Sequence, residues 1–99
     1  MNRVEILEDA KKQISGKRVE DYGKPEDNFL VIADFWGTYK GVNFTPKDVA
    51  IMMALMKIAR IRSDTKSDSY VDLAGYAACA GEIAFMEKER NNDKACLKE

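Results

Sequence analysis

The stretch VAIMMALMKIARI, residues 49–61, is apolar on nearly every side when it is drawn as a helix. It directly follows TPKD, residues 45–48, which offers a threonine for the N-cap, a proline for the first helical turn and an aspartate three residues after the cap. We therefore expect a helix over about residues 46–62. Because a helix that is apolar all round touches neighbours on several sides, this segment is predicted to lie at the centre of the fold.

Three further segments predict helices around this central one. Residues 3–15 place apolar side chains at helical spacing between charges, and a glycine follows them. Another helix is expected to begin at Pro25, where proline and two acidic residues suit a helix start, and the last is expected over about residues 69–90. No strand-like alternation persists, so the predicted fold class is all-α, a compact bundle of about four helices. We expect residues 1–99 to form a single domain with a polar, frayed tail at about 91–99.

The size and charge of the chain limit its partners. A chain of 99 residues buries only a modest core, so assembly into a homo-oligomer is an expected route to stability. The 16 basic and 17 acidic residues leave a net charge of -1, which offers no global field for a nucleic acid polymer or an anionic membrane. No apolar segment approaches the ~20 residues that a transmembrane helix requires. We therefore expect a cytoplasmic protein that binds neither nucleic acid polymers nor membranes.

The composition also excludes several kinds of catalysis. The sequence has no histidine, which removes the commonest general base and the commonest zinc ligand. Nucleophilic systems that pair serine or cysteine with histidine are therefore excluded. Cys79 and Cys96 stand at neither metal-ligand nor disulfide-framework spacing, so we expect two free thiols in a reducing compartment, with Cys79 as a small core residue. We expect no cofactor.

The most informative side chains are polar groups embedded in apolar helical surroundings. Lys57 and Arg60 lie about one turn apart on the central helix, so they are expected to share a mostly buried face. On the last helix Asp68, Asp72 and Tyr76 repeat at four-residue spacing and also share a face. One interpretation is a salt-bridge network that ties these two helices together, with Asp72 closing a capping box on the serine three residues before it. The other is a pocket in which the two cations hold a phosphate or another anion and the acids orient it.

The stretch DYGKPEDNF, residues 21–29, fits the second interpretation. Lys24 would add a cation, Gly23 permits close approach of the backbone, and the helix that starts after them offers amide donors. An aromatic ring would stack on a base, and the candidates are Tyr22, Trp36 and Tyr76. Interpreted as an ordinary turn and helix start, the same stretch needs no ligand, and its two acids weaken an anion site.

Three motifs carry a resemblance to a known family. DYGKPEDNF, KIARI and DSYVDLAGYAA together resemble a family of small bacteriophage proteins of unassigned function, similar in turn to the nucleotide-modification-associated domain. In that family a D-Y-G turn, a K-x-x-R on a central helix and a D-x-x-x-D-L-x-x-Y helix recur, and the resemblance covers roughly residues 18–84. It implies an all-α phage protein that handles nucleotides. The positions that match the motifs are Asp21, Tyr22, Gly23, Lys24, Asn28, Lys57, Arg60, Asp68, Asp72 and Tyr76.

A weaker resemblance is to all-α NTP pyrophosphatases of the MazG-like type. Those enzymes bind magnesium through paired glutamates on one helix and an acid pair on the next. This sequence offers EILED, residues 5–9, and DSYVD, residues 68–72, but its central helix carries a lysine and an arginine where further acids would be needed. That departure counts against magnesium catalysis, and we expect no metal site.

These observations leave three functions open, of which the first is favoured. The first is non-catalytic binding and sequestration of a small nucleotide-derived molecule, by which a phage protein would remove a cyclic or ADP-ribose-type immune signal in the cytoplasm of the infected bacterium. The second is a magnesium-dependent nucleotide pyrophosphohydrolase, which would use Asp68, Asp72 and acids from residues 5–9. The third is a helical protein-interaction module, in which the small residues over 75–81 serve assembly.

Overall fold

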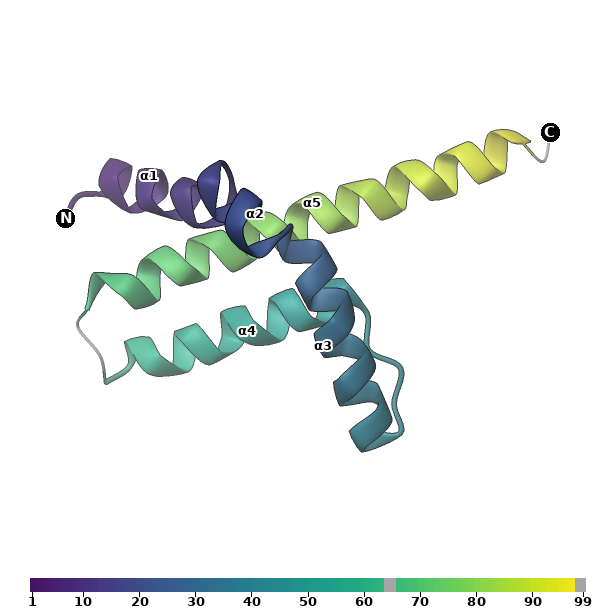
Figure 1. Ribbon diagram of the computed structural model, residues 1–99, viewed down its shortest axis with the longest axis horizontal. Helices are drawn as coiled ribbons and strands as arrows, with labels where there is room; N and C mark the ends of the chain where they lie inside the picture. The colour runs from purple at the N-terminus through teal and green to yellow at the C-terminus, as the bar shows by residue number, and fades with distance from the viewer. Residues whose placement is uncertain (64–65, 98–99) are drawn as a thin grey trace.

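The computed structural model describes residues 1–63 and 66–97, with side chains as far as Asn91. All regular structure in these residues is α-helical, which confirms the predicted all-α fold class. Four of the helices have at least 12 residues and the remaining one has six. In chain order (Figure 1) they are α1 (Arg3–Ile14), α2 (Lys17–Tyr22), α3 (Pro25–Lys40), α4 (Pro46–Ile61) and α5 (Ser67–Leu97).

Helix α4 begins as the sequence predicts. The Thr45 hydroxyl accepts a hydrogen bond from the Asp48 backbone N–H at 3.1 Å, and the Asp48 carboxylate accepts one from the Thr45 N–H at 2.9 Å. This reciprocal capping box, together with Pro46 in the first turn, fixes the start of the helix. The helix ends at Ile61, one residue before the expected end.

A short helix that the sequence analysis missed lies between α1 and α3. Helix α2 has six residues, and Gly16 and Gly23 flank it with φ angles of 61° and 83°, a region that glycine favours. Because so short a segment completes fewer than two turns, it has too little periodicity to be recognised, and its glycines suggest turns instead. The D-Y-G motif therefore closes α2, and α3 begins two residues later at Pro25.

Helix α5 is longer than expected at both ends. It begins at Ser67 and extends to Leu97, so the predicted frayed tail is helical as far as that residue. The sequence after Gly81 contains neither glycine nor proline and includes several glutamates and lysines, which are good helix formers. Residues 98–99 of the predicted tail lie outside the described residues.

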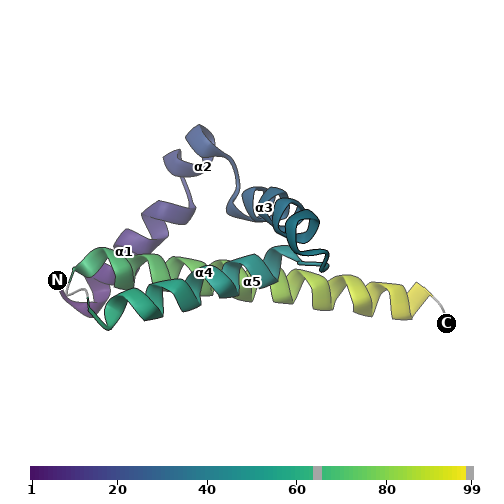
Figure 2. The same ribbon diagram turned by 90° about the horizontal axis from the view of Figure 1, so that it is seen from below.

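Helices α4 and α5 form an antiparallel pair at the centre of the molecule (Figure 1). Helix α1 packs against the first part of α5, and α3 crosses the beginning of α4 at a steep angle (Figure 2). The C-terminal part of α5 extends beyond these neighbours (Figure 1). As a result, the longest dimension is 51 Å and the radius of gyration is 15.5 Å, compared with ~13 Å for a typical domain of 100 residues.

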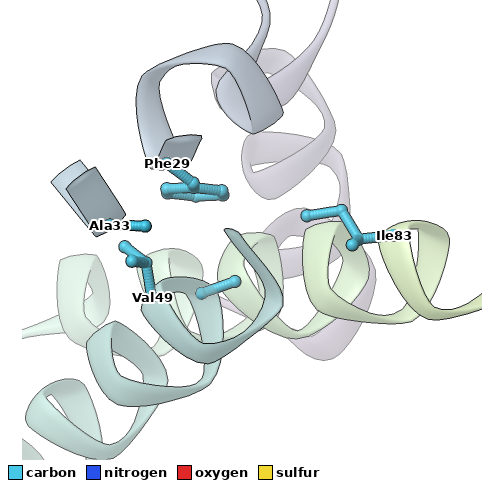
Figure 3. Close-up of a cluster of buried hydrophobic side chains, with 5 residues drawn as sticks. Phe29, Ala33, Val49 and Ile83 are labelled. Atoms are coloured by element: carbon cyan, nitrogen blue, oxygen red, sulfur yellow. The ribbon is translucent and has the colours of Figure 1, made fainter. Parts of the chain in front are cut away.

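A small apolar core forms where α3, α4 and α5 meet. Phe29 and Ala33 of α3 face Val49 of α4, and Ile83 of α5 completes the cluster together with Ala50 (Figure 3). Val49 is fully buried, with an exposed fraction of 0%. The first turns of α4 are therefore central to the fold, as predicted.

No other described helix covers the outer side of α4, which the segment 42–44 borders only at its beginning. The large apolar side chains of α4 that remain exposed are Ile51, Met52, Leu55, Met56 and Ile58. The prediction that this helix touches neighbours on several sides therefore holds for its inner side, where α3 and α5 contact it, and not for its outer side. Although the outer side is apolar, no helix in the described residues is long and apolar enough to cross a membrane.

Candidate functional site

A groove of about 350 Å³ lies where α1, α2 and the start of α3 meet the first half of α5. Figure 2 shows α2 standing above α5, between α1 and α3. We call this site the α2 groove. Its lining residues are Gln13, Ile14, Arg18, Tyr22, Gly23, Pro25, Asn28, Phe29, Asp72, Tyr76 and Cys79. Of the residues predicted from the sequence, the groove brings together Tyr22, Gly23, Asn28, Asp72 and Tyr76.

The D-Y-G motif shapes one wall of the α2 groove. Gly23 ends α2 with a positive φ, and its N–H donates a hydrogen bond to the Val19 carbonyl at 2.8 Å. Across the turn, the Asn28 side-chain amide donates to the Tyr22 carbonyl at 3.3 Å. These two bonds hold the turn between α2 and α3 in place. One joins two backbone groups and the other joins the Asn28 side chain to the backbone, so together they position Tyr22, Gly23 and Asn28 in this wall.

Arg18 is a groove residue that the sequence analysis missed. Its guanidinium carbon lies 4.6 Å from the centre of the Tyr22 ring, which is a cation–π distance. The available signal was the spacing of four residues between an arginine and a tyrosine, which places both on one face of a helix. That signal was lost because α2 itself was not recognised. The cation that lines the groove is therefore Arg18 and neither Lys57 nor Arg60.

The opposite wall is formed by α5. Tyr76 packs against Phe29 with ring centroids 6.1 Å apart and an angle of 49° between the planes, and the Phe29 ring is buried. One turn before Tyr76, the Asp72 side chain is 37% exposed and its carboxylate lies 2.9 Å from the Lys57 ammonium. Lys57 itself is only 8% exposed, so it stands behind Asp72 and neutralises its charge from the interior.

This pair corrects two details of the sequence interpretation. Ser69 is the third residue of α5 and cannot be its N-cap, so the predicted capping box between Ser69 and Asp72 is wrong. Asp72 instead ties α5 to α4 through Lys57, as the salt-bridge interpretation expects for this one pair. The predicted buried face shared by Lys57 and Arg60 is also wrong, because Arg60 is exposed. It lies in the last turn of α4, beyond the region that α3 covers.

Four other predicted residues do not line the α2 groove. Asp21 is exposed on α2, and Asp68 is exposed in the first turn of α5. Trp36 packs edge-on against Phe44 at 6.0 Å beside the core, so it is not available for stacking in this groove. Lys24 instead lines an adjoining cavity of about 390 Å³.

Cys79 borders both cavities, which also share Ile14 and Pro25. Burial raises the pKa of the Cys79 thiol above its ordinary value, and the negative charges of Glu26 and Glu82 raise it further. The thiol is therefore held in its protonated, weakly nucleophilic form at neutral pH. Cys79 is half-buried beside the core, close to its expected place as a small core residue.

The acidic residues considered for magnesium do not converge. Among the residues that the structure describes, no group of three or more acidic or cysteine side chains is placed to hold a metal ion. The carboxylate of Asp72 is already paired with Lys57. The side chains that the structure describes therefore do not fit a magnesium site of the MazG-like type, which grips the ion with several carboxylates.

Comparison with known proteins gives a family without an assigned activity. The family model described as "Domain of unknown function (DUF6378)" matches residues 5–84. The "Gene 55 protein" of Mycobacterium phage L5 is 47% identical over 87 residues, which cover 86% of this chain and 56% of the relative. The "Gene 55 protein" of Mycobacterium phage D29 is 43% identical over 79 residues, which cover 79% of this chain and 52% of the relative.

These matches confirm the expected resemblance to small phage proteins of unassigned function. The matched region begins at residue 5, earlier than the motifs suggest, and ends at residue 84 as expected. The chain spans about half the length of the curated relatives it matches. No solved structure matches the chain.

Proposed function

This chain belongs to the phage protein family described as domain of unknown function DUF6378, and from that premise we propose that it binds and sequesters a small nucleotide-derived molecule in the α2 groove. One observation carries the proposal. Side chains from two segments some 50 residues apart, each singled out by a sequence motif, line the same groove, and an arginine joins them there. Tyr22 and Asn28 come from the first segment, and Asp72 and Tyr76 from the second.

The size of the groove suits one small ligand. A volume of about 350 Å³ falls in the lower part of the ~300–1,000 Å³ range of small-molecule sites. The mixture of aromatic rings, one cation and side-chain amides is typical of such a site, where apolar surface supplies affinity and a few polar groups supply orientation. A nucleic acid polymer would need a wider basic surface, which the net charge of -1 does not provide.

The charges of the groove suit a ligand that carries both an anion and a flat ring. Arg18 offers a planar guanidinium that binds a phosphate with two parallel hydrogen bonds. Tyr22, which is 66% exposed, and the half-buried Tyr76 offer ring faces for a base. Because Lys57 neutralises Asp72, that carboxylate can accept hydrogen bonds from a ribose or a base without strongly repelling the phosphate.

The proposed use of such a binder assumes that this chain, like its relatives, is a phage protein. A phage protein that holds a cyclic or ADP-ribose-type signal in the host cytoplasm would withdraw it from the host's immune system. The nucleotide class of the ligand follows from the expectation that the phage family is similar in turn to the nucleotide-modification-associated domain, which remains a prediction. The paired state of Asp72 favours binding over the alternative, a magnesium-dependent pyrophosphohydrolase.

The test is a capture experiment. The purified protein is incubated with NTPs, cyclic dinucleotides and ADP-ribose derivatives in the presence of magnesium, freed of unbound ligand and denatured, and the released compounds are chromatographed. We expect one compound to be recovered intact in near-stoichiometric amount. Arg18→Ala removes the groove's cation, so recovery should fall by ~10-fold or more, since a charge-assisted hydrogen bond contributes about 1.5–3 kcal/mol.

Arg3→Ala is the matched control. Arg3 is exposed at the opposite end of α1 from the groove, so the substitution removes the same charge from the protein and should leave recovery unchanged. If recovery of the compound fell equally in both variants, the effect would come from the change in net charge and not from a contact in the groove. Release of a new product would show that the protein hydrolyses the compound instead of sequestering it. If no compound from the panel were recovered, the proposal would be contradicted.

A further inference from the structure

Helix α4 has an unusual distribution of charge. Between Val49 and Ala59 its single charged residue is Lys57, and Lys57 points inward to Asp72. The outward side chains over the same stretch are all apolar. A surface helix of a monomeric protein normally shows the reverse pattern, with apolar residues inside and charges outside.

The exposed apolar side chains of α4 form one continuous surface, which we call the α4 face. Ile51, Leu55 and Ile58 follow one another at spacings of four and three residues, so they lie in one row along the helix. Met52 and Met56 lie beside this row at the same spacing of four. These five side chains are between 39% and 57% exposed. No charged side chain interrupts them, so the face is suited to pack against another apolar surface.

We propose that a second copy of this chain covers the α4 face. The accessible surface of the chain is 7651 Å², whereas a monomeric protein of 11.2 kDa is expected to expose only about 5,700 Å². The excess of about 2,000 Å² is more than the ~800 Å² that each partner buries in an interface of standard size. A two-fold dimer through the α4 face would bury part of this excess, including the apolar row of Ile51, Leu55 and Ile58.

The charges at the two ends of the face fit an antiparallel pairing of α4 with its copy. Asp48 lies at the start of the helix and the exposed Arg62 directly follows its end. Leu55 lies midway between them, seven residues from each. A two-fold axis near Leu55 therefore sets Asp48 opposite the partner's Arg62, and sets each Leu55 against its own copy. The α2 groove contains no residue of α4, so the dimer leaves it open.

Sedimentation velocity over about 1 to 100 μM tests the proposal, because a dimer becomes more populated with concentration. We expect a concentration-dependent dimer for the natural chain. Leu55→Glu places a charge without a partner at the centre of the contact, so the dissociation constant should rise at least ~10-fold. The matched control is Leu7→Glu on α1, since Leu7 is 62% exposed and Leu55 57%. It introduces the same charge at a similarly exposed leucine and should leave the dimer intact.

Cross-linking fixes the geometry and remains informative if the glutamate variant does not fold. In a Cys79→Ala, Cys96→Ala background, Leu55→Cys should form a covalent dimer with a short bis-maleimide, whereas Leu7→Cys should remain a monomer. A monomer at every concentration overturns the proposal. So does a dimer that Leu55→Glu leaves unchanged, or one that cross-links equally well through both positions.

Discussion

The two sides of α4 show that hydropathy alone does not decide what a helix buries. The inner side buries Val49, Ala50 and a charged lysine, whereas the outer side leaves Ile51 and Leu55 about half exposed. Lys57 is buried because α5 supplies Asp72 at 2.9 Å, and Leu55 is exposed because the described chain supplies no neighbour. Burial therefore follows from what a partner element offers, and an apolar surface without a partner indicates a contact that the single chain does not make.

The largest effect is expected from breaking the ion pair on its exposed side. Asp72→Asn leaves the buried ammonium of Lys57 without a counter-charge, so the free energy of unfolding should fall by about 3 kcal/mol, a typical cost of removing one partner of a buried pair. Lys57→Met should cost less, because the remaining Asp72 is 37% exposed and can be hydrated. Urea denaturation of both variants measures the difference. Equal losses would mean that the lysine is not truly shielded from water.

Val49→Ala tests the apolar part of the inner side. Val49 is fully buried between α3 and α5, so the loss of two methyl groups should lower the free energy of unfolding by about 2 kcal/mol. Ile51→Val is the contrasting change on the outer side and should cost less than ~0.5 kcal/mol at concentrations where the chain is a monomer. Thermal unfolding followed by circular dichroism compares the two. A larger effect at Ile51 would reverse the assignment of inner and outer sides.

Thr45→Ala removes one half of the capping box at the start of α4. The Asp48 N–H then loses its side-chain acceptor, so the free energy of unfolding should fall by about 1 kcal/mol. Thr45→Ser keeps the hydroxyl and serves as the control, with nearly unchanged stability. A similar loss in the serine variant would assign the effect to the threonine methyl group.

The smallest effect is expected at Arg60, three residues from Lys57 on the same helix. Arg60 is exposed, so Arg60→Ala should change the free energy of unfolding by less than ~0.5 kcal/mol. A nucleotide-binding measurement distinguishes the phosphate site predicted from the sequence from the α2 groove seen in the structure. The sequence makes Arg60 a phosphate ligand, whereas the structure leaves it outside the α2 groove, so we expect Arg60→Ala to retain more of the captured nucleotide than Arg18→Ala does. The opposite order would favour the pocket predicted from the sequence.

Features of this fold that depend on interactions between neighbouring residues could be predicted from the sequence, whereas those that depend on distant residues could not. The start of α4 was predicted because a capping box is made by residues three apart, and it acts wherever the helix packs. The position of Trp36 was not predicted, because its spacing on α3 fits a residue of the core as well as a residue of a groove. The contact that places it beside the core is with Phe44, which lies outside α3. Periodicity identifies a face but not the element that covers it.

The candidate site was recovered in part for the same reason. Tyr22, Asp72 and Tyr76 were found because motifs marked them, and the salt-bridge interpretation anticipated the pair of Lys57 and Asp72. The sequence also placed Lys57 and Arg60 in the site, whereas Arg18 is the cation that lines the groove. Arg18 was missed because the short helix that carries it is held by its neighbours and by two glycines more than by its own periodicity. Local signals of that kind are too weak to be recognised before the tertiary structure is known.

Neighbouring helices pack against only part of α5, so the two parts of this continuous helix are expected to differ in how easily they unfold locally. Its 31 residues correspond to ~46 Å, close to the full 51 Å length of the molecule, whereas α4 with 16 residues accompanies it for only ~24 Å. Up to Ile83 the helix is covered by α1, α3 and α4, but Phe85 and Met86 beyond it are 68% and 45% exposed. We therefore expect amide hydrogens in the first part to exchange with solvent mainly through large-scale opening, and those over residues 85–91 to exchange through local opening. One continuous helix is thus expected to show two rates of hydrogen exchange, set by the neighbours of each part.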